Sequence, residues 1–253
     1  MRKRCRVWMG IAVFFGTLNI SSAQQLPKLS VGYRYSQFYS HSAWVVEGSE
    51  EEIIRHSRID YSFEPYHEIY TRVGRFYALF GVSEAAVNGE INFQKYDLEE
   101  RFQMFTAGFT FLESEKNVYI QNAAFYRFMG LPVVVGKKSD AGTTEWKGEF
   151  SENHWIGITT TVTPLKQGLN YYLSISYGLV SYTKTEDDST WAFIPLQGEI
   201  GLRYSTVMQK VALGVRAGYN VFTPFLLPMN KDSDLSLSTG IFGGWTLSVI
   251  MGF

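Results

Sequence analysis

The chain has 253 residues, a formal net charge of −1 and an aromatic content of 16%. Beyond the first twenty residues it contains no apolar run near 18 residues, so the sequence excludes a helical membrane span. A secreted soluble β-protein and a membrane β-barrel remain.

The first 23 residues have the organisation of a secretory signal peptide. Basic residues gather at positions 2–6, an apolar run covers 8–18, and Ser21-Ser22-Ala23 provides small residues for cleavage before Gln24. The only cysteine, Cys5, lies in this leader, so we expect the mature chain to have no disulfide, no thiolate metal site and no thiol nucleophile. No cofactor is expected. Loss of the basic leader leaves an acidic excess, which argues against nucleic acid as a partner.

Alternation with a period of two continues along most of the remaining chain. Leu29 to Ser36 alternates apolar with small or polar residues, and the cleanest example runs from Val211 to Val221. A turn around 65–68 is expected to lead into a strand over 71–82. Residues 83–100 read as a polar loop, although Ile91-Asn92-Phe93 could extend a strand. Further strands are expected over 58–64, 104–111, 118–129, 156–162, 171–179 and 194–203.

The pattern predicts an antiparallel up-and-down β-barrel of ten strands, with eight or twelve as alternatives. Short turns near 66, 115, 166 and 207 would lie on one rim and long loops near 45, 90, 140, 187 and 230 on the other. Tryptophans at 44, 146, 155, 191 and 245 are expected at the loop level, and Phe63, Phe111, Tyr171, Tyr204 and Phe253 at the turn level.

The last strand carries the most specific motif. Its apolar face consists of Trp245, Leu247, Val249, Met251 and Phe253. This strand resembles the closing strand of bacterial outer-membrane β-barrel proteins, including the small OmpA and OmpX types, which ends in Phe as an assembly signal. The resemblance implies a signal peptide at 1–23, a transmembrane barrel at 24–253 and a location in the Gram-negative outer membrane. The implied partners are outer-membrane lipid or lipopolysaccharide, the barrel-assembly machinery and an envelope protein.

Isolated charges lie on the polar face, which is otherwise rich in Gly, Ser and Thr. In a barrel of this size they would form a lumen network whose members are Arg34, Arg58, Asp60, Glu64, Arg127, Glu199, Arg203 and Arg216. Glu199 is expected to meet Arg216 or Arg203. A structural network is the leading interpretation, and an electropositive constriction that selects small anions is the alternative.

The sequence contains no recognisable catalytic arrangement. The four histidines, at 41, 56, 67 and 154, show neither the spacing of a zinc site nor that of a base and nucleophile pair. We therefore expect a non-enzymatic barrel with a structural or interaction role through its outer loops. A narrow channel for small solutes is the alternative, and an outer-membrane lipid hydrolase or protease is the third hypothesis.

Overall fold

The computed structural model describes residues 29–47, 57–91, 94–114, 118–138, 144–164, 167–185, 190–191, 194–208, 211–224 and 235–253. These residues form strands and no helix, which confirms the predicted all-β class. No helix among them is long and apolar enough to cross a membrane. The expected signal peptide, 1–23, lies outside the described residues.

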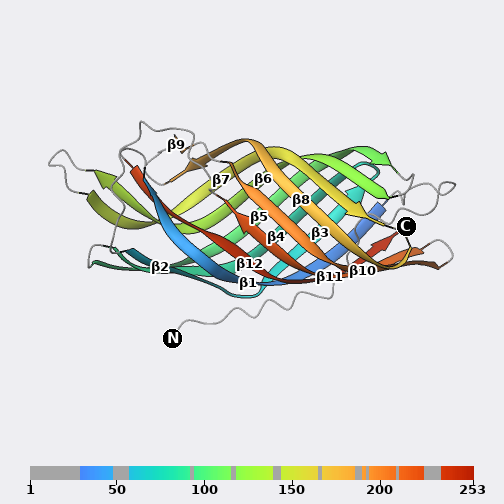
Figure 1. Cartoon of the computed structure of the whole chain (residues 1–253), viewed down its shortest axis with the longest axis horizontal. Helices are drawn as coiled ribbons and strands as arrows, with labels where there is room; N and C mark the ends of the chain where they lie inside the picture. The colour runs from blue at the N-terminus through green and yellow to red at the C-terminus, as the bar shows by residue number, and fades with distance from the viewer. Residues whose placement is uncertain are drawn as a thin grey trace.

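The strands form one closed ring (Figure 1). Their bounds are β1 (Leu29–Glu47), β2 (Ser57–Phe63), β3 (Tyr66–Val73), β4 (Phe76–Ile91), β5 (Gln94–Ser114), β6 (Tyr119–Lys138), β7 (Thr144–Thr163), β8 (Gly168–Lys184), β9 (Thr190–Trp191), β10 (Leu196–Met208), β11 (Val211–Thr223) and β12 (Leu235–Gly252). The ring runs β1-β3-β4-β5-β6-β7-β8-β10-β11-β12 and closes through antiparallel pairing of β12 with β1. The predicted ten-stranded antiparallel barrel is confirmed.

At two places in the ring a proline separates two consecutive strands that pair with the same neighbour. β2 and β3 both pair with β4, and the register slips by one residue between Phe63↔Ala85 and His67↔Val82. Pro65 lies in this slip, and Pro195 lies between β9 and β10, which both pair with β8. Proline has no N–H for the ladder, so it interrupts each strand without ending it.

The turn expected around 65–68 is therefore wrong. The chain reverses instead at Gly74-Arg75, between Val73 and Phe76, and Gly74 has a φ of 58°. The two-residue hairpin turns of types I′ and II′ both require a positive φ at the first central position, which glycine adopts without strain. The strand expected over 71–82 is consequently two strands, β3 and β4.

We call the part of the barrel that contains the turn at Gly74-Arg75 and the carboxyl ends of β5, β7 and β10 the turn half, and the opposite part the loop half. The carboxyl end lies in the turn half, at the right of Figure 1. There Leu29 and Phe253 exchange backbone hydrogen bonds of 3.4 and 2.8 Å, which extend the closure to the last residue.

The polar loop expected over 83–100 is also wrong, because β4 and β5 continue into the loop half as a long hairpin. They stay paired from Phe76↔Phe109 to Ile91↔Gln94. Glu84, Asp97 and Glu99 made this segment read as a loop, yet they lie on the exposed face of paired strands.

The ring divides in the loop half. Pairing of β5 with β6 stops at Gln103↔Gly130, and β6 pairs farther out with β12, from Val135↔Leu237 to Lys137↔Leu235. The β4–β5 and β6–β7 ends accordingly diverge toward the left of Figure 1. The loop half is thus closed by a second pairing across the barrel.

Apolar side chains fill the interior of the loop half. The cluster contains Phe38, Ile59, Tyr61, Phe63, Tyr66, Ala85, Val87, Ile91, Phe102, Met104, Phe125, Met129, Leu131, Val133, Val134, Val135, Trp155, Phe222 and Phe242. Phe38 and Phe222 meet edge to face at 5.2 Å, and Phe63 meets Phe242 at 5.2 Å. The inner face of the loop half is therefore a hydrophobic core.

One polar contact ties three strands together within this core. Ser238 of β12 lies 2.7 Å from the hydroxyl of Tyr61 on β2 and accepts a 2.7 Å bond from the backbone N–H of Val134 on β6. Burial raises the pKa of Tyr61 above its ordinary value, which the hydrogen bond with Ser238 only partly offsets. The Tyr61 hydroxyl therefore stays protonated.

Two aromatic residues lie elsewhere than expected. Phe63 belongs to the core of the loop half, not to the turn rim, and Trp155 points inward with 1% of its surface exposed. Trp245 does lie on the exterior, 66% exposed. Trp191 is placed in β9, but its side chain lies outside the described part.

The loop-half core should contribute strongly to stability. Phe102→Ala removes a fully buried ring and should lower the free energy of unfolding by about 3–5 kcal/mol. Arg101→Ala changes the neighbouring side chain, which is exposed, and should cost under about 0.5 kcal/mol. Urea unfolding followed by tryptophan fluorescence measures both, and equal effects would contradict the core assignment.

Candidate functional site in the barrel lumen

Polar side chains line the interior of the turn half. On β1 the residues Ser30, Arg34 and Ser36 point inward, whereas Leu29 and Tyr35 are exposed outside. The faces are thus inverted relative to the loop half, where apolar residues point inward. Side chains alternate between the two faces of a strand, so an inward charged residue identifies the face of its strand that lines the lumen.

The strand register places the charges in line. Arg203 is opposite Arg216, Arg216 opposite Ser248, Ser248 opposite Arg34, and Arg34 opposite Glu68. This row crosses β10, β11, β12, β1 and β3. The closure of the ring between β12 and β1 therefore assembles the site from the two ends of the chain.

Arg34 is the centre of an ion-pair network. Its guanidinium lies 2.9 Å from Glu199 and 3.5 Å from Glu68, and the two carboxylates are 9% and 4% exposed. Tyr172 donates a further hydrogen bond to Glu199. The sequence predicted Arg216 or Arg203 as the partner of Glu199, and the structure shows Arg34 as its ion-pair partner.

Arg127 reaches the same space from β6. Its Nε donates to Thr106 at 2.9 Å, and its Nη1 donates to Gln197. The guanidinium also lies over the rings of Phe125 and Trp155, at 4.9 and 5.3 Å from their centroids. Arg127 therefore sits at the boundary between the polar lumen and the apolar core.

Arg203 and Arg216 both lie in the lumen, on β10 and β11. Arg203 is 3% exposed, and Arg216 lies over the ring of Tyr172, 5.3 Å from its centroid. Tyr172 covers Gly218, where an added Cβ would meet the phenol. The glycine thereby gives the aromatic ring room against the barrel wall.

A second ion pair was not predicted from the sequence. Arg72 of β3, 2% exposed, lies 3.1 Å from Glu113 of β5 and donates a 2.6 Å bond to the carbonyl of Gly74. The turn expected at 65–68 placed Glu68 in the turn and Arg72 on a strand that continued to residue 82. Neither the Arg72–Glu113 pair nor the inward position of Glu68 was therefore predicted. The Val-Gly-Arg-Phe sequence at 73–76 was the signal that could have corrected it.

The structure does not bring Arg58, Asp60 and Glu64 into the lumen. All three are exposed, on the outer face of β2 or just after it, while Ile59, Tyr61 and Phe63 point inward. The expectation assumed that the apolar face is external along the whole strand. β2 lies in the loop half, where that relation is inverted.

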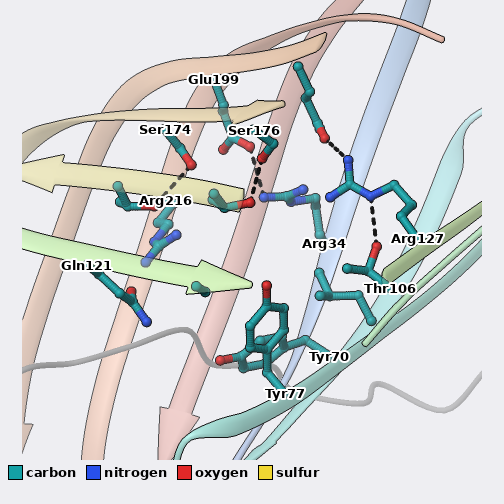
Figure 2. Close-up of a pocket in the computed structure, with 15 residues that line it drawn as sticks. Arg34, Tyr70, Tyr77, Thr106, Gln121, Arg127, Ser174, Ser176, Glu199 and Arg216 are labelled. Atoms are coloured by element: carbon teal, nitrogen blue, oxygen red, sulfur yellow. Dashed lines mark hydrogen bonds and ion pairs between the residues drawn. The ribbon is translucent and has the colours of Figure 1, made fainter. Parts of the chain in front are cut away.

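A cavity of about 150 Å³ lies among the lumen charges. Figure 2 shows Arg34, Arg127, Arg216 and Glu199 around it, together with hydroxyl-bearing residues. Thr159 bonds to Ser176 at 2.7 Å, and Thr161 to Ser174 at 3.0 Å, along the β7–β8 wall. The arrangement offers many hydrogen-bond donors and one carboxylate.

The histidines lie away from the cavity. His41 bonds to Tyr219 at 2.6 Å, His154 bonds to Tyr126 at 2.8 Å, and His67 bonds to Tyr33, all among exterior side chains. His56 lies outside the described residues. Within the described ranges no three His, Cys, Asp or Glu residues are grouped to hold a metal ion.

The predicted assembly-signal residues share the outer face of β12. Trp245, Leu247 and Phe253 are at least half exposed, and Val249 and Met251 are partly buried on the same face. Ile250 points inward and is 4% exposed.

The Arg34 network should be structurally essential. Arg34→Ala leaves the buried carboxylates of Glu68 and Glu199 without their shared cation, and should lower the free energy of unfolding by about 3–5 kcal/mol. Adding Glu68→Gln and Glu199→Gln to this variant should restore much of the loss, because no buried charge is then stranded. Arg58→Ala is the matched control on an exposed arginine. Denaturant melts in detergent compare the variants, and no loss in Arg34→Ala would refute the network.

Comparison with known proteins adds no assignment. No model of a known protein family matches the chain, and no curated protein matches it.

Proposed function

We propose that this chain is an integral barrel of the bacterial outer membrane whose turn half lies in lipid. The observation that carries the proposal is the inversion of faces between the two halves. A soluble barrel buries its apolar face inside along its whole length, as only the loop half does here. The turn half has the opposite arrangement, which lipid stabilises and water does not.

The apolar exterior of the turn half is extensive. Its exposed members include Leu29, Tyr35, Ile69, Val73, Phe76, Phe80, Phe105, Phe111, Ile156, Leu169, Tyr171, Leu173, Ile175, Tyr177, Ile200, Leu202, Tyr204, Leu247 and Phe253. From Trp245 to Phe253, a strand tilted by about 40° rises roughly 20 Å, close to the apolar band of about 25 Å in such barrels. Trp245 would then lie at the headgroup level.

The loop half extends beyond this band with a charged exterior. Arg58, Asp60, Glu84, Lys95, Asp97, Glu99, Arg101, Glu145 and Lys147 are exposed there. β5 has 21 residues and β6 has 20, about twice the 9–11 that cross a bilayer. We infer that this charged extension is an interaction platform for another envelope component or for lipopolysaccharide headgroups.

A solute channel is the weaker candidate. Its polar cavity lies in the turn half, but the path outward meets the apolar core of Phe38, Phe63, Phe102, Phe222 and Phe242. Packed aromatic rings leave neither space nor polar partners for a hydrated ion.

Single-cysteine labelling tests whether the turn half lies in lipid and the loop half in water. Leu173 and Arg101 are both exposed on the barrel exterior, in the turn half and the loop half respectively. With Cys5 removed, Leu173→Cys in lipid vesicles should resist a membrane-impermeant maleimide supplied on both sides, whereas Arg101→Cys should react. Both should react after denaturation, and rapid labelling of Leu173→Cys in intact vesicles would contradict the proposal.

Planar bilayers test the closed core. The purified barrel should show no steady conductance, because aromatic side chains occupy the interior of the loop half. Folding of the barrel is verified separately by slower migration of boiled than of unboiled samples on gels, which reports the closed sheet. A steady ohmic conductance from inserted protein would instead favour the channel.

A further inference from the structure

The lumen cavity has two opposite walls of different chemistry. One wall is formed by hydroxyl side chains of β7 and β8, and the other by Tyr70 of β3 and by Tyr77 and Leu79 of β4. β3 and β8 have four strands between them on either side of the ring, so they face each other across the barrel. Figure 2 shows the two tyrosines on the side of the cavity away from Ser174 and Ser176.

The hydroxyl wall consists of two cross-strand pairs. Thr159 lies opposite Ser176 and Thr161 opposite Ser174, and the paired oxygens are 2.7 and 3.0 Å apart. Either member of each pair can donate, and the hydroxyl that accepts keeps its own hydrogen for a further partner. This wall can therefore both donate and accept hydrogen bonds. A carboxylate only accepts and an ammonium only donates, whereas a ligand hydroxyl does both and matches the wall.

Charged side chains at the cavity have partners within the chain. Arg34 donates to Glu199 at 2.9 Å, and Tyr172 donates to the same carboxylate. Arg127 donates to the side-chain oxygen of Gln197, which also lines the cavity. A ligand therefore meets paired charges and need not bring a charge of its own.

The opposite wall is apolar and suits a flat ring. The rings of Tyr70 and Tyr77 stack with their centroids 6.2 Å apart and their planes at 27°, and Leu79 packs beside them. A cyclic sugar has C–H groups on its faces, which pack on such a surface, and hydroxyls around its edge. The cavity volume is about 150 Å³. An apolar cavity of about that volume holds one benzene ring, so a single six-membered ring fits.

We propose that this cavity is a binding site for a small neutral polyol of the monosaccharide class. The hydroxyls of the ligand exchange hydrogen bonds with the β7–β8 wall, and its C–H face packs on Tyr70 and Tyr77. The site lies inside the barrel and makes no use of the exterior. The inference therefore goes beyond the proposed function and holds whether or not the turn half lies in lipid.

Equilibrium dialysis of the barrel, refolded from urea into detergent with the ligand present, tests this site. The probes are radiolabelled glucose, galactose, mannose, myo-inositol and glycerol, each used alone, and the barrel should bind at least one of them. Ala123→Leu fills the cavity from β6 and should weaken binding by at least about tenfold. Ala124→Leu is the matched control, because the next side chain along β6 is exposed on the exterior, and it should bind as the parent does.

Ser176→Ala tests the hydroxyl wall without adding bulk. Loss of one neutral hydrogen bond should weaken binding by about two- to tenfold, while slower gel migration after boiling shows that the variant folds. A parent that binds none of the five probes holds water only in its cavity, and this overturns the proposal. Unchanged binding by folded Ala123→Leu also overturns it, because the ligand then lies elsewhere. If Ala123→Leu does not fold, Ser176→Ala decides, and unchanged affinity in that variant overturns the proposal.

Discussion

The pairing of β1 with β12 is the interaction on which the rest of the structure depends. It runs from Ser30↔Gly252 to Glu47↔Ser236 and joins the two ends of the described chain. Close approach requires Gly244, whose missing Cβ leaves room for the carbonyl of Gln37. Closure removes the sheet edges and brings Arg34 within 2.9 Å of Glu199, 165 residues away in the chain. The fold and the lumen network therefore form together.

Much of this architecture follows from alternation alone. A period of two predicted the ten strands, and it predicted the inward direction of Arg34, Arg127, Glu199, Arg203 and Arg216. Periodicity separates the two faces of a strand, but it does not say which face meets the core. That choice depends on the surroundings, which differ between the two halves, and Arg58, Asp60 and Glu64 were misassigned for this reason.

The ion-pair partners could not be predicted from the sequence, for a different reason. Which inward charges meet depends on the register of each strand pair and on its interruptions, such as the one at Pro65. A one-residue slip there changes every later neighbour along the barrel wall. Glu68 and Arg72 follow this slip, so their inward positions could be read only after the turn at Gly74 was located.

A one-residue error in strand register would be unfavourable in both halves of the barrel, for opposite reasons. A one-residue shift of β11 against β12 would turn Arg216 outward in the turn half, and in the proposed membrane an arginine at mid-depth costs about 2–4 kcal/mol. The same shift would turn Phe222 of the loop half out of its core and toward water. Each long strand thus has one register that satisfies both surroundings. Inversion of the faces, which makes the sequence hard to interpret, is what makes the register unambiguous.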